Sequence, residues 1–348
     1  MNQQEWPMIF DKEMTAIIKG TALIFMMLLH CYGSSNYDVA LNFSYSPISR
    51  ISGVFKICIS IFAFMVGFGY SFSKERDLSY CINHIRKLLI PFWLIMIIFT
   101  FPLCWSDVCS SGWKTLLYNM IGIDSHFNYY SWFVYFYIYA MIVMPYVSFF
   151  IDRCPIWHTI LMVFLSVLLT GGIHYVFGIG TSRFAMALFN CSMMTPTTVL
   201  GYLFGREHYY ERLKINKKLP KWCVLLFAVS LIVIVLRIRF YRWGWNGFLL
   251  DFFYAPIVIG ALVVIFNKFE FKPLRGVLVR IGDLSTYMWF FHALFFTKAV
   301  RWFYQPAITV FSDVNLVVLW TIILTYVVSW IIKRLVDIVS LRFVGLTS

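Results

Sequence analysis

Two ionisable side chains stand eleven residues apart in the first strongly apolar segment of the chain, KGTALIFMMLLHCYG. In an α-helix, His30 would follow Lys19 by about 1100° of rotation, only ~20° beyond three full turns, and by a rise of roughly 16 Å. A cation and an imidazole would therefore share one helix face at two depths. An ammonium group binds phosphate well, and an imidazole exchanges protons near neutral pH.

The composition places this pair inside a lipid bilayer. Apolar residues make up 61% of the 348 residues and charged residues only 13%, whereas a soluble domain carries about twice that charged fraction. Ionisable groups in a bilayer are costly and usually face inward, so Lys19 and His30 are functional candidates. The alternatives are a lysine that extends to the lipid headgroups and a histidine that is only packed and hydrogen-bonded.

The elements that must position these residues are membrane-spanning helices. Ten apolar stretches are long enough to cross the ~30 Å hydrocarbon core, and we expect them at residues 15–34, 51–72, 87–104, 129–151, 157–178, 184–205, 221–240, 248–267, 284–304 and 314–335. We therefore predict an all-α, polytopic helical bundle that forms one membrane-embedded domain over residues 1–348, with no separate soluble domain. The segment 105–128 is expected to be a re-entrant or interfacial loop.

The distribution of basic residues predicts the orientation. Nineteen Lys and Arg residues fall in segments on the same side as the N-terminus and eight on the opposite side. Because cytoplasmic loops carry the excess of Lys and Arg, both termini should be cytoplasmic in a cell membrane. The net charge of +13 is then mostly a signal of topology, and nucleic acid is not an expected partner. The acidic start, MNQQEWPMIFDKEM, is unlike a cleavable signal peptide, so the first span should be retained.

Neither the cysteines nor the histidines form a metal-binding pattern. The eight cysteines include no C-x-x-C pair and no zinc-like spacing, and the seven histidines are scattered. We therefore expect no metal site and no permanently bound cofactor.

Four segments together resemble the acyltransferase-3 family of integral membrane acyltransferases. KGTALIFMMLLH is similar to the family's first helix, in which a basic residue, usually arginine, precedes a histidine by eleven positions. The other three segments, in matching order, are IFAFMVGFGYSF followed by a basic stretch, YYSWFVYFYIYAMIVMP and IGDLSTYMWFFH. Two positions depart from the family pattern: Lys19 replaces the usual arginine, and Val66 stands where a serine is expected.

The resemblance implies transfer of an acyl group, usually acetyl, from cytoplasmic acyl-CoA to a hydroxyl of a saccharide or lipid-linked glycan. In that reaction His30 would be the proton acceptor, because an alcohol loses its proton as it attacks a thioester. Lys19 would neutralise a phosphate of CoA. Acyl-CoA, the glycan acceptor and the bilayer are then the expected partners, with acetyl-CoA as donor substrate.

Further candidate site residues follow from the same motifs. His292 would orient His30, bind the acceptor hydroxyl or hold the thioester carbonyl; its alternative role is interhelical hydrogen bonding. The remaining candidates for donor or substrate binding are Arg86, Lys87, Trp132, Ser285 and Tyr287. Positive-inside bias alone explains Arg86 and Lys87, and an interfacial aromatic belt explains Trp132 and the tyrosines at 129, 130, 135, 137 and 139.

Two other functions are compatible with ten spans. A transporter or flippase of a glycan or small solute is the first, although the acidic residues lie in loops or at span ends rather than in the middle of helices. A non-catalytic membrane sensor with the same fold is the second, and the two motif departures favour it. Acyl-CoA hydrolysis or transfer by purified protein separates an enzyme from both.

Overall fold

The computed structural model describes residues 10–33, 52–73, 76–177, 183–212, 251–269 and 271–344, with isolated positions between 225 and 236. Every regular element in these ranges is helical. Six helices are long and apolar enough to cross a membrane, which confirms a polytopic helical membrane fold: Lys12–Tyr32, Ser52–Ser71, Leu78–Ser110, Trp132–Arg153, Asp251–Lys268 and Val314–Ile338. The span expected at 221–240 lies outside the described ranges.

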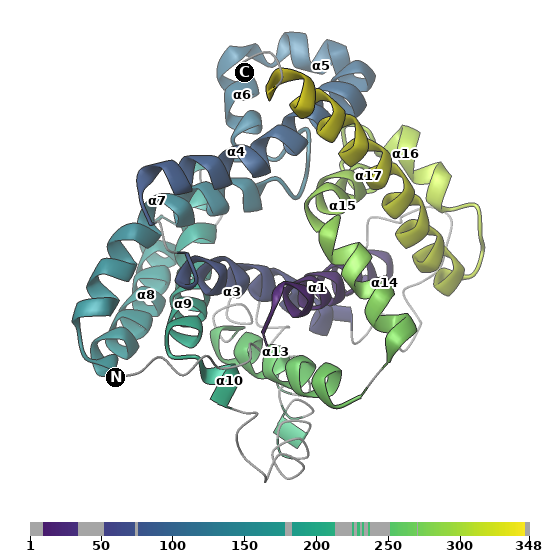
Figure 1. Ribbon diagram of the computed structural model, residues 1–348. Helices are drawn as coiled ribbons and strands as arrows, with labels where there is room; N and C mark the ends of the chain where they lie inside the picture. Colours follow the sequence, from purple (N-terminus) through teal and green to yellow (C-terminus); the bar gives the residue numbers. More distant parts are fainter. Residues whose placement is uncertain are drawn as a thin grey trace.

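The described helices follow one another in the order labelled in Figure 1. In the first half of the chain they are α1 (Lys12–Gly33), α3 (Ile57–Ser71), α4 (Leu78–Ile95), α5 (Trp105–Ser110), α6 (Gly112–Met120), α7 (Trp132–Arg153) and α8 (Ile156–Phe177). In the second half they are α9 (Arg183–Arg206), α10 (Tyr209–Arg212), α13 (Asp251–Lys268), α14 (Lys272–Asp283), α15 (Ser285–His292), α16 (Arg301–Ile308) and α17 (Val314–Val344). The helices α8 and α9 cover the spans expected at 157–178 and 184–205.

Aspartate side chains mark the start of two helices that carry candidate residues. The Asp11 carboxylate accepts a hydrogen bond from the backbone N–H of Met14 at 2.7 Å, at the start of α1. The Asp77 carboxylate accepts from the backbone N–H of Tyr80 at 2.8 Å, at the start of α4. Each bond satisfies one of the N–H groups that the first helical turn leaves unpaired, so the sequence fixes where these helices begin.

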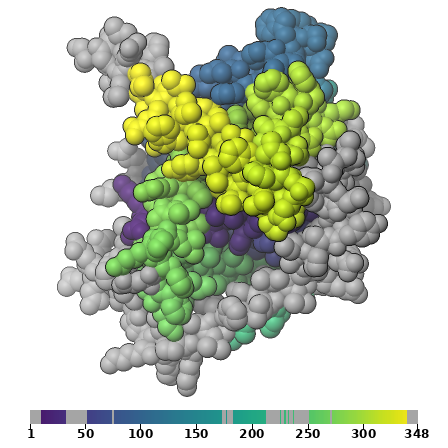
Figure 2. All heavy atoms as spheres, turned by 90° about the vertical axis from the view of Figure 1, so that its right-hand side faces the viewer, coloured from purple at the N-terminus to yellow at the C-terminus, as the bar shows by residue number. Residues whose placement is uncertain are grey.

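The helix α1 is packed in the middle of the bundle and contacts α3, α13, α14, α15 and α17. Its closest neighbour is α14, because glycines remove the side chains at the contact. A β-carbon at Gly20 would lie 2.2 Å from the Leu278 carbonyl oxygen, and one at Gly282 would lie 1.9 Å from the Ala16 carbonyl oxygen. Figure 2 shows α17 and α16 over one side of the molecule, with purple atoms of α1 visible beside green atoms of the later helices. This packing fixes the position of Lys19.

The expectation of one continuous span over 284–304 is wrong. The helix α15 ends at His292, a short 3-10 segment follows at Ala293–Phe295, and α16 begins only at Arg301. Two hydrogen bonds join this irregular segment to the residues before α7: the Asn128 amide donates to the Phe290 carbonyl at 3.2 Å, and the Thr297 hydroxyl accepts from the backbone N–H of Tyr129 at 3.0 Å. Irregular backbone is tolerated at this depth because protein surrounds it.

The third expected span is longer than predicted. The helix begins at Leu78 rather than at residue 87, and it continues through a π-helical segment, Met96–Thr100, and a 3-10 segment, Phe101–Cys104. The Tyr304 hydroxyl donates to the Phe99 carbonyl at 2.7 Å, which stabilises the π-helical backbone. The residues that follow form α5 and α6, two short helices with exposed tryptophans at 105 and 113, as an interfacial segment would have.

Candidate functional site

The helices α1, α3, α4, α7 and α15 surround a cavity of about 310 Å³. Four of the five helices come from segments that carry the sequence motifs. The wall is mostly apolar and includes Met65, Val66, Leu88 and Met141. Val66 therefore places an apolar side chain at the position where the family resemblance leads us to expect a hydroxyl.

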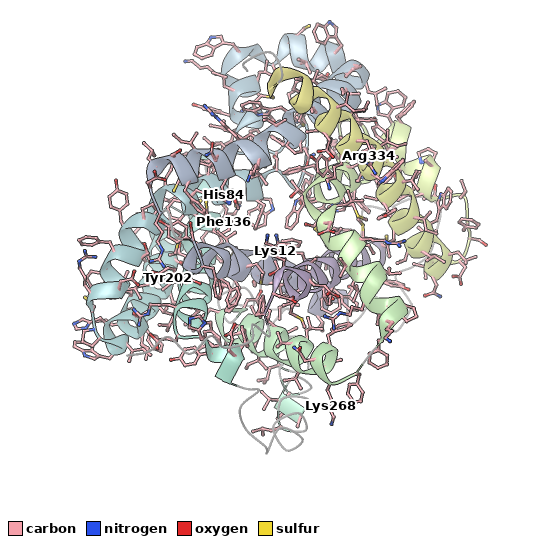
Figure 3. The ribbon with its side chains drawn as sticks, in the orientation of Figure 1. Lys12, His84, Phe136, Tyr202, Lys268 and Arg334 are labelled. Carbon is pink, nitrogen blue, oxygen red and sulfur yellow. The ribbon has the colours of Figure 1, made fainter. Side chains whose placement is uncertain are left out.

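Basic side chains line one part of this cavity. Lys19 and Lys87, both predicted from the sequence, share the wall with His84, which is labelled in Figure 3. The His84 ring packs against the Tyr80 ring with 4.0 Å between centroids and 33° between the planes, and its Nδ1 donates to the Tyr80 carbonyl at 2.9 Å. Three basic groups from α1 and α4 thus face one space, and such a space suits an anion.

The two candidate catalytic histidines meet at the other end of α1. The ring centroids of His30 and His292 lie 5.5 Å apart. Tyr130 completes the cluster: its hydroxyl lies 2.7 Å from Nδ1 of His30, and its ring stacks on His292 at 5.3 Å with 7° between the planes. The structure therefore brings together residues from α1, α15 and the segment before α7. Hereafter these three residues are the histidine cluster.

Hydrogen bonding defines which nitrogen of His292 is basic. Nδ1 of His292 lies 3.2 Å from the Met288 carbonyl oxygen. Because a carbonyl only accepts, Nδ1 carries the proton and Nε2 of the neutral ring is an acceptor. His292 is fully buried, and Nε2 has no hydrogen-bond donor among the described residues. His30, in contrast, is only half-buried.

The histidine cluster and the cavity are adjacent but separate. Neither histidine lines the cavity, whereas Trp289, one helical turn before His292, does. Of the other predicted site residues, Ser285 lines the cavity together with Lys19 and Lys87. Three do not line it: Arg86, which is exposed, and Trp132 and Tyr287, which are half-buried. The binding roles of these three stay predictions.

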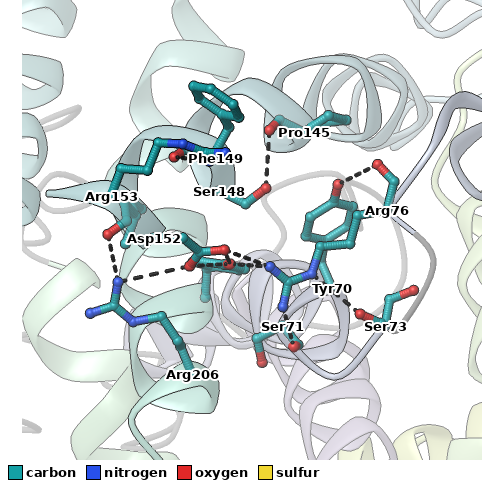
Figure 4. A network of polar contacts seen from close by, with 12 residues as sticks. Tyr70, Ser71, Ser73, Arg76, Pro145, Ser148, Phe149, Asp152, Arg153 and Arg206 are labelled. Atoms are coloured by element: carbon teal, nitrogen blue, oxygen red, sulfur yellow. Dashed lines mark hydrogen bonds and ion pairs between the residues drawn. The ribbon is translucent and has the colours of Figure 1, made fainter.

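An ion-pair network holds one end of the cavity wall in place (Figure 4). The Arg76 guanidinium donates to the Asp152 carboxylate at 2.8 Å and to the Tyr202 hydroxyl at 2.6 Å, and Arg206 lies 3.8 Å from the same carboxylate. The Tyr70 side chain lines the cavity, and its hydroxyl donates to the Arg76 carbonyl at 3.3 Å. The network therefore ties the segment between α3 and α4 to α7 and α9.

Two cavity residues were missed by reasoning from the sequence, although helical spacing contains a signal for both. His84 stands three residues before Lys87, so the two share a face of α4. Trp289 stands four residues after Ser285 and three before His292, again on one face. The hydrogen bond between Tyr130 and His30 has no local signal, because it joins residues 100 positions apart.

The described residues contain no group of three or more His, Cys, Asp or Glu side chains placed to hold a metal ion. The groups that the histidine cluster and the neighbouring cavity present are two imidazoles, a phenol and basic side chains.

These features define a multi-pass membrane protein with a basic cavity and an adjacent histidine cluster inside its helical bundle. The family model Acyl_transf_3, described as an acyltransferase domain, matches residues 16–334, which include every candidate residue. The chain therefore belongs to the acyltransferase-3 family of membrane acyltransferases. Searches of curated proteins and of solved structures found no match.

Proposed function

We propose that this acyltransferase moves an acyl group, acetyl in the simplest case, from cytoplasmic acyl-CoA to a hydroxyl of a cell-surface or lipid-linked saccharide. One observation carries the proposal: α1 holds Lys19 in the wall of a basic cavity and, eleven residues later, His30 in a cluster with a second histidine. The rise between the two positions, roughly 16 Å, is of the order of the pantetheine arm that separates the phosphates of CoA from its thioester.

The cavity is the proposed donor site. Phosphate oxygens of CoA would contact Lys19, Lys87 and His84, since all three face the cavity and charge-assisted hydrogen bonds to phosphate are strong. The apolar side chains of Met65, Leu88 and Met141 would contact the pantetheine arm. A bound phosphate would also offset the cost of a lysine at this depth.

The histidine cluster is the proposed catalytic centre. If Nδ1–H of His30 donates to the Tyr130 oxygen, Nε2 is the basic nitrogen. As the acceptor oxygen attacks the thioester carbonyl carbon, its proton passes to Nε2 and the carbon–sulfur bond breaks. The leaving CoA thiolate then takes the proton from the imidazolium, so the products are an acyl ester and free CoA with His30 neutral again. Nε2 of His292 would accept a hydrogen bond from the acceptor saccharide.

The predicted orientation adds direction to this chemistry. With both termini in the cytoplasm of a cell-membrane protein, Lys19 lies toward the cytoplasm and His30 toward the outer half. Donor and acceptor would then approach from opposite sides, and the acyl group would cross the bilayer without movement of CoA.

Mass spectrometry of glycans from cells with and without the gene tests the proposal. We expect a mass difference of one acyl group on a surface or lipid-linked saccharide, restored by the wild-type gene. Purified protein should also release CoA from acyl-CoA when the acceptor is added. Glycan movement without CoA release would instead indicate a transporter. If the protein shows neither glycan movement nor CoA release, the result would favour a membrane sensor.

A further inference from the structure

Three aromatic side chains pack together at one end of the cavity. The Trp289 ring lies 4.6 Å from Phe133 and 4.8 Å from Phe62, and the two phenylalanine rings are 6.3 Å apart. All three line the cavity, and they come from α15, α7 and α3. Hereafter these three residues are the aromatic partition.

The order of residues along each helix places the aromatic partition between the cavity and the histidine cluster. The cavity residues of α3 run from Phe62 to Tyr70, and those of α7 run from Phe133 to Met141. Phe133 follows Tyr130 by three positions, and Trp289 precedes His292 by three. The aromatic partition therefore occupies the end of the cavity that is nearest to the histidine cluster. An acyl group that enters beside Lys19 and moves along the cavity toward His30 therefore meets these side chains.

Trp289 carries a polar group that the fold does not use. The side chain is only 5% exposed, and its indole N–H has no acceptor in the described part of the chain. Two other tryptophans behave differently: the N–H of Trp93 donates to the Met120 carbonyl and that of Trp320 to the Ala307 carbonyl, each at 2.8 Å. A buried donor without an acceptor is rare and destabilising, so it requires an explanation.

A second unsatisfied polar atom lies one helical turn away and has the opposite character. Nε2 of His292 is a buried acceptor without a described donor, whereas the Trp289 N–H is a buried donor without an acceptor. The two residues are three positions apart on α15 and so share one helix face. An acyl transfer needs both kinds of group, because the carbonyl oxygen accepts hydrogen bonds and the attacking saccharide donates them.

We propose that Trp289 is a catalytic residue whose indole N–H donates a hydrogen bond to the carbonyl oxygen of the acyl thioester. The inference rests on the proposed function, and it places the carbonyl group of the thioester between Trp289 and His292. When the acceptor oxygen attacks the carbonyl carbon, an electron pair of the C=O bond moves onto the carbonyl oxygen. The indole N–H stabilises the negative charge on that carbonyl oxygen. The pair returns as the carbon–sulfur bond breaks, and the CoA thiolate takes the proton held by His30.

Replacement of Trp289 by 3-benzothienylalanine tests the proposal, because this analogue exchanges the N–H for sulfur and retains the shape of the ring system. We expect kcat for acyl transfer from acyl-CoA to fall on the order of 100-fold, as when one carbonyl-binding donor is removed elsewhere. The KM for acyl-CoA and the unfolding temperature should be unchanged. Trp289→Phe should show the same loss of kcat, with a lower unfolding temperature because part of the ring volume is lost.

The same analogue at Trp93 is the matched control. Its N–H bonds the Met120 carbonyl, so its loss should lower the unfolding temperature and leave kcat unchanged. Wild-type kcat with the analogue at 289 would overturn the proposal, as would a change confined to KM. His30→Gln in the same preparation distinguishes the two claims: if it is inactive while the analogue at 289 has wild-type kcat, only the role of Trp289 is wrong. If His30→Gln is fully active, the role of His30 as base is wrong, whereas the proposed function fails if the wild-type protein forms no acyl ester.

Discussion

The hydroxyl of Tyr130 lies 2.7 Å from Nδ1 of His30, although the two residues are 100 positions apart in the chain. The tyrosine ring also stacks on His292 at 5.3 Å. One side chain thus contacts both histidines. It holds the His30 ring by its Nδ1 edge; in the proposed mechanism, Nε2 is then the nitrogen that exchanges a proton with the acceptor.

Tyr130→Phe should lower kcat about tenfold with little change in the KM for acyl-CoA. The change removes one hydrogen bond of about 0.5–1.5 kcal/mol that sets the tautomer and orientation of His30, but it keeps the stacked ring. Steady-state kinetics with purified protein measure this. Tyr129→Phe is the control, because that neighbouring side chain is 54% exposed and should tolerate the change. Equal activity of the two variants would exclude a positioning role for Tyr130.

Lys19 should act through its charge. Lys19→Ala should raise the KM for acyl-CoA about 10- to 100-fold, the value of one hydrogen bond to a charged group, whereas Lys19→Arg should retain function. Lys12→Ala changes an exposed lysine on the same helix outside the cavity and should leave KM unaltered. If Lys19→Ala has a normal KM, this lysine only extends to the lipid headgroups.

Gly282→Ala should lower the unfolding temperature and weaken donor binding. The added β-carbon would lie 1.9 Å from the Ala16 carbonyl oxygen, so α1 and α14 must separate and Lys19 must move. Gly276→Ala on the same helix meets nothing within 4 Å and should be neutral or slightly stabilising, because alanine is the better helix former. Thermal unfolding in detergent measures both. Similar unfolding temperatures for the two variants would mean that the contact between the helices is not tight.

Reasoning from the sequence predicts the parts of the site that depend on local periodicity. The pairing of Lys19 with His30 on one helix follows from 3.6 residues per turn, and the helical membrane fold follows from the long apolar runs. The break after His292 could not be predicted, because the hydrogen bonds around it join distant positions: the Asn128 amide bonds the Phe290 carbonyl, and the Thr297 hydroxyl bonds the N–H of Tyr129. The contact of Tyr130 with His30 was missed for the same physical reason: it depends on how whole helices pack. The sequence offered Trp132 and its aromatic neighbours either a role in substrate binding or a place in an aromatic belt. The structure places Tyr130 in the histidine cluster and Phe133 in the aromatic partition.

Cysteine labelling on intact cells tests the orientation. In a protein stripped of its eight native cysteines, a membrane-impermeant thiol reagent should label Ser111→Cys, which lies between α5 and α6, and should not label Lys217→Cys. The reason is that the segment from Arg206 to Lys221 carries six basic residues, and such segments stay in the cytoplasm. Permeabilised cells, in which both cysteines should react, are the control. The reverse pattern would place His30 on the cytoplasmic side and make transfer across the membrane unnecessary.

The most direct measurement of the central claim is a single turnover of acyl-CoA by purified His30→Gln protein in the presence of the acceptor saccharide. Glutamine fills a similar space and forms hydrogen bonds, but it cannot accept the proton of the attacking hydroxyl. We predict a normal unfolding temperature, normal binding of acyl-CoA and no acyl ester. A folded His30→Gln protein that forms the ester at the wild-type rate would contradict the account.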